Sequence, residues 1–383
     1  MSTKTLFGKE VCQWSVLNSY EVPSVVESFE KEVYALRNGV ALSDISHTVM
    51  VRISGPNAFM FIDRIIPCFV TLKPNQMRQT VFINSEGALF AEGYICRDET
   101  CWMFLVHGID PDLFIKWLHE QKAESEQVDI ELLNTSYCLL SVNGPFAWEL
   151  MAEVEEPEII SLPYLSLYHP DDKRIIFRAG ETGEFGYHIM VPRECAEQEW
   201  ERLVSKGCVF DLVCVGYTAI EYCMLENSFF NIYREGQAGK TPAELQIQWR
   251  VSYRKEFAFA QQLKAYKNSP LQRRLTTVYL EAEPLPKGTI KLESLEIGTI
   301  VCGYPNCHGT GWIGLAMINL PYAVAGVNEY RAESASGYVR CSTLSMPLVN
   351  NRSLYVDPQI HSYADREELT FPKLSCIEVD HAE

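Results

Sequence analysis

Alternating apolar and polar positions mark one strand early in the chain, and the same pattern returns further on. In segment 48–66 the stretch TVMVRIS alternates as a half-buried strand does, and Gly55-Pro56 leads from it into an apolar helical run. In segment 139–154 the sequence LLSVNGPFAWELMAEV repeats this order of strand, Gly-Pro turn and helix. We therefore predict that the first two-thirds of the chain form two related α+β halves.

The segments around these repeats carry further strand and helix signals. Strand-like runs at 79–83, 88–96 and 101–106, separated by short turns, predict an antiparallel meander. Asp110 followed by Pro111 is typical of a helix start. Near the N-terminus, Ser24 and Glu27 form a capping box in front of apolar residues at helical spacing, so a helix is predicted over 24–39.

The last third of the chain has a different character. After the polar stretch 268–274, short strand-like runs alternate with Gly and Pro, which predicts a small β-barrel or sandwich. The predicted organisation is a region of two related halves over 1–267, a barrel over 275–360 and a charged tail over 361–383. The fold class is therefore predicted to be α+β.

Net charge and cysteine content limit the kinds of binding partner and the cellular compartment that we expect. The 383 residues carry a formal net charge of −17, which argues against binding to nucleic acid or to an anionic membrane. The N-terminal residues lack the features of a secretory signal, and no apolar run approaches the roughly 20 residues of a membrane span. The 13 cysteines are an odd number without disulfide spacing, so we expect free thiols and a cytoplasmic location.

Two familiar motifs are interpreted as structural. GTGWIG (309–314) has the spacing of a dinucleotide fingerprint, but no clear strand precedes it and no convincing helix follows it, so tight turns between barrel strands are favoured. The pair Cys96 and Cys101 and the pair Cys302 and Cys307 lie in different predicted domains and lack knuckle composition. We therefore predict no metal site.

Histidines and a glycine-rich loop supply the candidate chemistry. His47, in DISH, and His107, in LVHG at a strand end, are the histidines best placed to face a cavity, and a structural role is the alternative for each. The loop RAGETGEFGYHI (178–189) presents Glu181 and Glu184 between glycines. Such a carboxylate suits a planar ligand that offers two parallel N–H donors, as a pterin ring edge does, and an ordinary surface turn is the alternative.

Several motifs, in order along the chain, resemble the aminomethyltransferase family, the T-protein of the glycine cleavage system and its tetrahydrofolate-dependent relatives. NGVALSDISH, QTVFINSEGALFAEGYI, RAGETGEFGYHI, TPAELQIQWRV and IGTIVCGYPNCHGTGWIGLAMI are each similar to a family motif. The resemblance implies a three-domain folate-binding fold, two related halves with a C-terminal β-barrel, and tetrahydrofolate as cofactor. It implies that Glu184 grips the pterin and that Arg178 and Thr182 shape its loop, and we add Gln79 to the cofactor-binding residues.

The sequence also departs from the family pattern. The family's first Asp of a DD pair, associated with catalysis, falls on Ala91, and the second falls on Glu92. Glu181 replaces a Tyr and His107 an expected Asn. Glycine cleavage itself is therefore not expected.

The resemblance instead implies transfer of a methyl or methylene group between a small molecule and tetrahydrofolate, as in the family's demethylases. We predict that Glu92 or His107 moves the proton and that Tyr94 orients the reacting groups. The alternative is a folate-binding scaffold or regulatory protein without turnover. The sequence identifies neither the one-carbon donor nor a protein partner.

Overall fold

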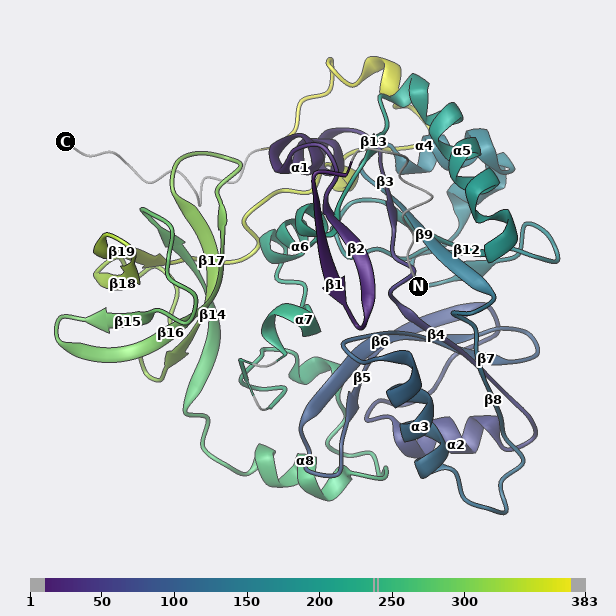
Figure 1. The fold of residues 1–383 in the computed structure, drawn as a ribbon, viewed down its shortest axis with the longest axis horizontal. Coiled ribbons are helices and arrows are strands. Elements are labelled where there is room, and N and C mark those ends of the chain that lie inside the picture. Colours follow the sequence, from purple (N-terminus) through teal and green to yellow (C-terminus); the bar gives the residue numbers. More distant parts are fainter. Residues whose placement is uncertain (1–10, 237, 240, 373–383) are drawn as a thin grey trace.

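The computed structural model describes residues 11–236, 238–239 and 241–372 (Figure 1). It contains two antiparallel-dominated sheets with helices on their outer faces, and a closed six-stranded barrel built from the C-terminal third. The predicted α+β class with a C-terminal barrel is confirmed.

The first sheet is five-stranded and antiparallel. Its strands lie in the order β5 (Gln76–Ile83), β6 (Leu89–Arg97), β7 (Trp102–His107), β4 (Val49–Ser54) and β8 (Asp129–Leu132). Helices α2 (Ala58–Ile65) and α3 (Pro111–Gln121) bury their apolar sides against one face of it. Asp110 caps α3 by accepting a hydrogen bond from the backbone of Asp112, as its position before Pro111 predicts.

The second sheet has six strands. Their order is β10 (Leu167–Tyr168), β11 (Ile175–Phe177), β12 (Gly186–Pro192), β9 (Tyr137–Asn143), β3 (Ala41–Asp44) and β13 (Val213–Cys214), with β13 parallel to β3. Helices α4 (Ala147–Val154) and α5 (Ala196–Gly207) cover its outer face. In both halves a strand, a Gly-Pro turn and a helix follow one another, as the repeat predicts.

Glycine is required at both turns of this repeat. Gly55 and Gly144 have φ of +102° and +129°, and a Cβ at either would lie within 2.5 Å of a backbone carbonyl oxygen. The faces of the two sheets that no helix covers pack on each other through apolar residues, among them Met50, Leu105 and Phe177. The candidate site lies against this inter-sheet layer.

An N-terminal hairpin displaces the start of the first helix. Strands β1 (Gln13–Leu17) and β2 (Tyr20–Val25) pair with each other, and α1 spans Phe29–Asn38. The predicted helix start at Ser24 is therefore wrong, because that residue lies in strand β2 of the hairpin. Ser28 caps α1, and Glu32 reaches back to the backbone N–H groups of residues 26 and 27.

Two long helices and a short one connect the sheets to the barrel. They are α6 (Tyr217–Glu226), α7 (Ile232–Glu235) and α8 (Ala260–Lys267). The barrel closes through β14 (Arg273–Leu280), β17 (Trp312–Asn319), β16 (Leu295–Pro305), β15 (Thr289–Leu292), β18 (Tyr330–Ser334) and β19 (Gly337–Thr343). Short 3-10 turns cover Pro157–Ser161, Arg193–Cys195, Cys208–Phe210, Gln248–Arg250, Arg352–Leu354 and Tyr363–Asp365.

The first three residues of GTGWIG lie in the turn between β16 and β17 and the last three begin β17, so the motif belongs to the barrel as predicted. After β19 the chain leaves the barrel and returns to the second sheet (Figure 1). Tyr363 is buried there against Phe146, and its backbone N–H donates to Glu149. The first part of the predicted charged tail, to residue 372, is thus packed on the protein, and 373–383 lie outside the described residues.

Across the described ranges, no helix is long and apolar enough to cross a membrane.

Candidate functional site

A largely enclosed cavity lies where the inter-sheet layer meets α6. Its volume open to the centres of water molecules is about 50 Å³, and the space between the lining atoms, open solvent included, is about 690 Å³. Strand β6 contributes Glu92 and Tyr94, the end of β7 contributes His107, and the glycine-rich loop contributes Glu181. The other lining residues form a polar set and an apolar or aromatic set. The polar set is Gln79, His47, Ser141, Asn143, Asn231 and Arg250, and the apolar or aromatic set is Ile45, Tyr217, Ile220, Met224, Phe229 and Phe230.

Glu181 is the carboxylate that the glycine-rich loop presents to this cavity. The Tyr94 hydroxyl donates to its Oε1 at 3.0 Å, and His188 Nε2 lies 3.4 Å from its Oε2. Burial alone would raise the pKa of Glu181, but His188, His107 and Tyr94 outweigh burial and hold this pKa at about 2. The side chain is therefore an ionised acceptor at neutral pH.

Two histidines in the cavity wall have unused hydrogen-bonding capacity. Within the described part of the chain, both ring nitrogens of His47 lack a hydrogen-bond partner, and so does Nδ1 of His107. Burial lowers the pKa of His47 to about 3 and that of His107 to about 4, so both imidazoles are neutral at pH 7. Buried polar atoms without partners are costly, and their position on a cavity indicates that a polar ligand or water satisfies them.

Glu92 and Arg250 form a buried ion pair on another wall. Glu92 Oε1 accepts from the backbone N–H of Ile232 at 2.8 Å, and Oε2 accepts from the Arg250 guanidinium. Burial raises the pKa of Glu92 to about 7, although Arg250 opposes the shift. Glu92 could therefore exchange a proton near neutral pH, but both of its oxygens already accept hydrogen bonds.

The strand register explains why the neighbouring position carries no acid. Ala91 is completely buried on the opposite face of β6, in the apolar core formed with α2 and α3. Glu92 and Tyr94 point to the cavity side. In this register the cavity-facing carboxylate of β6 is at position 92, so Ala91 does not leave a gap in the cavity wall.

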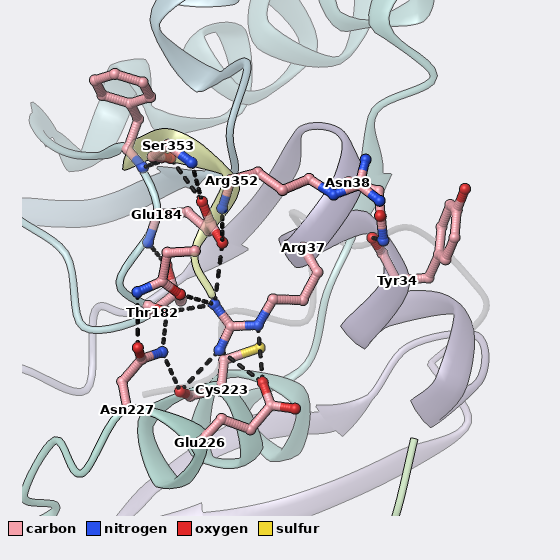
Figure 2. A network of polar contacts seen from close by, with 12 residues as sticks. Tyr34, Arg37, Asn38, Thr182, Glu184, Cys223, Glu226, Asn227, Arg352 and Ser353 are labelled. Atoms are coloured by element: carbon pink, nitrogen blue, oxygen red, sulfur yellow. Dashed lines mark hydrogen bonds and ion pairs between the residues drawn. The ribbon is translucent and has the colours of Figure 1, made fainter. Parts of the chain in front are cut away.

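Glu184 does not line the cavity. Its carboxylate accepts hydrogen bonds from Ser353 N at 2.8 Å, from Ser353 Oγ at 2.7 Å and from Arg352 N at 3.2 Å (Figure 2). Arg37 Nη1 lies 3.3 Å from the same carboxylate. This arrangement does not support the assignment of Glu184 to the pterin, because its acceptor sites are taken by the chain itself.

Arg37 connects the residues around Glu184 with helix α6 through hydrogen bonds. Its guanidinium donates to Glu226 Oε2 and to the carbonyl oxygens of Thr182 and Cys223 (Figure 2). It also donates to Asn351 Oδ1 at 3.0 Å. These atoms are buried, and the carboxylates keep the pKa of Arg37 above its ordinary value against the opposing effect of burial. Thr182 thus has a structural position, with its carbonyl facing Arg37 and not the cavity.

The barrel contacts this network through the turn between β16 and β17. His308, in the turn between β16 and β17, lies 2.5 Å from Glu226 Oε1. Neither Arg37 nor Glu226 is among the candidate site residues predicted from the sequence. Their contact joins positions 189 residues apart.

The other predicted cofactor residues have distinct places. Arg178 lies between the rings of Phe185 and Tyr187, 4.8 and 4.7 Å from their centroids, and donates to Gly186 O. Arg178 thus packs against the glycine-rich loop and does not line the cavity. Gln79 lines the cavity, and its Nε2 lies 3.4 Å from the Tyr94 hydroxyl. The structure thus brings together Gln79, Glu92, Tyr94 and His107, and places Glu184, Thr182 and Arg178 outside the cavity wall.

A second, more open groove adjoins the cavity. It lies between segment 225–250 and the barrel, its volume open to the centres of water molecules is about 630 Å³, and it shares Phe229, Phe230 and Arg250 with the cavity. No group of three or more His, Cys, Asp or Glu residues suited to a metal ion occurs in the described ranges.

Comparison with known proteins identifies relatives of the chain. Residues 4–255 match the family model of the GCVT N-terminal domain. An aminomethyltransferase of Thermoanaerobacter pseudethanolicus is 25% identical over 318 residues, which cover 80% of this chain and 86% of that protein. An aminomethyltransferase of Bacillus subtilis is 24% identical over 310 residues, covering 78% and 85%. The glycine cleavage system aminomethyltransferase T of Bartonella henselae has the same fold, with a TM-score of 0.79, 20% identity and coverage of 92% and 99%.

The buried Arg37 network generates a stability prediction. Replacing Arg37 with Met leaves the buried Glu226 carboxylate without its cation, and we expect a loss of about 3–5 kcal/mol in the free energy of unfolding. Arg52→Met is the matched control, because the Arg52–Glu131 pair is partly exposed and its loss should cost about 1 kcal/mol or less. Urea unfolding at pH 7 measures both, and equal losses would contradict a central role for Arg37.

The lowered pKa of His47 generates a pH prediction. Between pH 6.5 and about 3 the unfolded chain binds a proton at His47 that the folded protein does not, so folded stability falls as the pH is lowered through this window. Between pH 6.5 and 4.5 the free energy of unfolding of His47→Gln should therefore fall by about 2–3 kcal/mol less than that of the wild type. Urea unfolding at the two pH values, with exposed His119→Gln as control, checks this. If His47→Gln lost as much stability as the wild type over this pH range, His47 would not be buried and neutral in the folded protein.

Proposed function

Because the chain belongs to the GCVT N-terminal domain family, we propose that it is a tetrahydrofolate-dependent one-carbon transferase. In this proposal it moves a methyl or methylene group between a small molecule and tetrahydrofolate, as a demethylase does, and it does not carry out glycine cleavage. The family match and the aminomethyltransferase relatives support folate-dependent one-carbon chemistry in general. The departures from the family pattern at Ala91, Glu181 and His107 support the narrower proposal.

The ionised Glu181 carboxylate is the observation that carries the proposal. A pterin ring edge offers a ring N–H and an amino group side by side, and a carboxylate accepts both in one plane. Glu181 is ionised and held by Tyr94, its side chain is 21% exposed, and it faces the cavity. We infer that Glu181 holds the ring edge, in place of the sequence-based candidate Glu184.

The remaining cavity groups fit a polar planar ligand. The unpartnered nitrogens of His47 and the unpartnered Oδ1 of Asn143 can hydrogen-bond to it, and Gln79 lies beside Tyr94 at the same wall. The adjoining groove offers room for the part of the ligand that extends beyond the ring. When bound, tetrahydrofolate supplies a nucleophilic nitrogen that accepts or releases the one-carbon unit.

Proton movement falls to neutral His107 in this proposal. Its unpartnered Nδ1 borders the cavity and can accept a hydrogen bond or a proton, and the pKa of about 4 makes it a weak base at neutral pH. Tyr94 is a positioning residue, because its hydroxyl is committed to Glu181. Glu92 holds Arg250 and the start of α7, and its raised pKa leaves a role in proton exchange open to test.

A second candidate function is a folate-binding protein without turnover. It is favoured by one observation: both oxygens of Glu92, the cavity-facing acid of β6, are occupied by the chain. Mass spectrometry of tetrahydrofolate incubated with the protein and a panel of O-, N- and S-methyl donors separates the two functions. Formation of methylated folate supports the transferase, and its absence with every donor supports the binding protein.

The proposal includes a cytoplasmic setting and a small-molecule donor or acceptor as partner, with neither nucleic acid nor membrane bound. The twelve cysteines in the described ranges are all free, as suits a reducing compartment.

Folate binding tests the role of Glu181 directly. Calorimetric titration of the wild type with tetrahydrofolate should show binding, and Glu181→Gln should weaken it by about 10- to 100-fold, because a charge-assisted acceptor is lost. Exposed Glu86→Gln is the control and should bind as the wild type does.

Glu184→Gln, measured alongside, decides between the two glutamates. We expect it to lower the urea midpoint while the folded protein keeps most of its affinity, because Glu184 binds residues 352 and 353. If Glu184→Gln abolished binding in a folded protein and Glu181→Gln did not, the assignment to Glu181 would be wrong.

A further inference from the structure

The cavity is too narrow, in the arrangement observed, for the ring system that it is proposed to bind. Its volume open to the centres of water molecules is about 50 Å³. A cavity of about 150 Å³ holds one benzene molecule, and a pterin has two fused rings. Part of the cavity wall must therefore move before a pterin reaches Glu181.

Most of this wall is held in place. Strands of the two sheets form much of it, and their ladders of hydrogen bonds resist displacement. Helix α6 is fixed by Arg37 through Glu226, and the loop that carries Glu181 is fixed by Arg37 through Thr182 O. The turn between α6 and α7 and the neighbouring Arg250 make up the rest of the wall.

The turn between α6 and α7 places Phe230 at the boundary between the cavity and the outer groove. Phe229 and Phe230 line both spaces. The chain is anchored on either side of Phe230, because Phe229 N donates to Met224 O at 2.9 Å and the Asn231 side chain donates to the Tyr217 hydroxyl at 3.1 Å. The ring of Phe230 can therefore turn about its side-chain bonds while the backbone of the turn stays in place.

Arg250 holds the Phe230 ring in the observed position. Its guanidinium carbon lies 5.8 Å from the centroid of that ring and 5.1 Å from the ring of Trp249, which lines the groove. Cation–π contacts of this kind are weak enough to be broken by a side-chain rotation. Among the described residues, Nε of Arg250 is buried without a hydrogen-bond partner, so an entering polar ligand meets a donor beside the ring.

On the basis of the proposed function, we propose that Phe230 is a gate between the outer groove and the cavity and thereby a specificity-determining residue. In the closed arrangement its ring separates the two spaces. When the ring turns aside, groove and cavity become one channel that leads to Glu181. A ligand with its ring system at Glu181 and its remainder in the groove keeps Phe230 displaced and packs against it. The size of the side chain at position 230 therefore determines how readily a ring system passes.

The kinetics of tetrahydrofolate binding test this gate. The full-length protein is mixed with tetrahydrofolate in a stopped-flow instrument, and quenching of tryptophan fluorescence follows binding. Because the gate must open before the ligand enters, the observed rate for the wild type should level off as the tetrahydrofolate concentration rises.

Two variants change the gate in opposite directions. Phe230→Leu has a smaller side chain and should raise the association and dissociation rate constants several-fold, and the larger Phe230→Trp should lower both. A residue that only contacts the bound ligand would change the dissociation rate constant alone. Phe59→Leu is the matched control, because Phe59 lies exposed on α2 and lines neither space, and it should behave as the wild type does.

The possible outcomes separate the gate from the proposed function. Tetrahydrofolate binding with both rate constants unchanged in the variants, or with a change in dissociation alone, would overturn the gate and leave the proposed function standing. If neither variant folds, the wild type decides, and an observed rate that rises linearly to saturation would overturn the gate. Absence of tetrahydrofolate binding to the wild type would overturn the proposed function and this inference with it.

Discussion

The buried guanidinium of Arg37 is the interaction on which the arrangement of the site depends. It binds α6 through Glu226 and Cys223 O, the glycine-rich loop through Thr182 O, and the segment after the barrel through Asn351. These segments are far apart in the sequence and have no sheet in common. A buried cation tolerates little displacement of its acceptors, because any acceptor that leaves uncovers a charge in a medium of low dielectric constant. Arg37 therefore fixes α6 against the loop, and the cavity lies between them.

This fixation separates the two glutamates of the loop. Gly183 has φ of +85°, and a Cβ there would meet the side chains of Asn351 and Asn227, so the chain turns sharply between positions 181 and 184. Glu184 is drawn toward Ser353 and the Arg37 network, and Glu181 is left on the cavity side. One carboxylate holds the structure together, and the other is available to a ligand.

Local patterns predicted much of the fold, since alternation and turn residues act within a few positions. The strand of segment 48–66, its Gly-Pro turn and the helix start at Asp110 all appear where expected. The helix predicted from Ser24 failed because that residue is held in a hairpin with β1, a contact that no local pattern records. The alignment of β6 with the family's acidic pair directed attention to Ala91, whereas only the observed register shows that residue 91 faces the core and Glu92 the cavity.

The same limit applies to the site. A glycine-rich loop with two glutamates predicts a presented carboxylate, but which of the two faces a ligand depends on Arg37 and Ser353, and these are 147 and 169 positions from Glu184. A crystal structure of the protein with a stable reduced folate would show which glutamate binds the pterin. We expect the pterin amino group and ring N–H within about 3 Å of the Glu181 carboxylate, beside Tyr94. A pterin bound at Glu184, or in the outer groove with Glu181 unoccupied, would contradict this expectation.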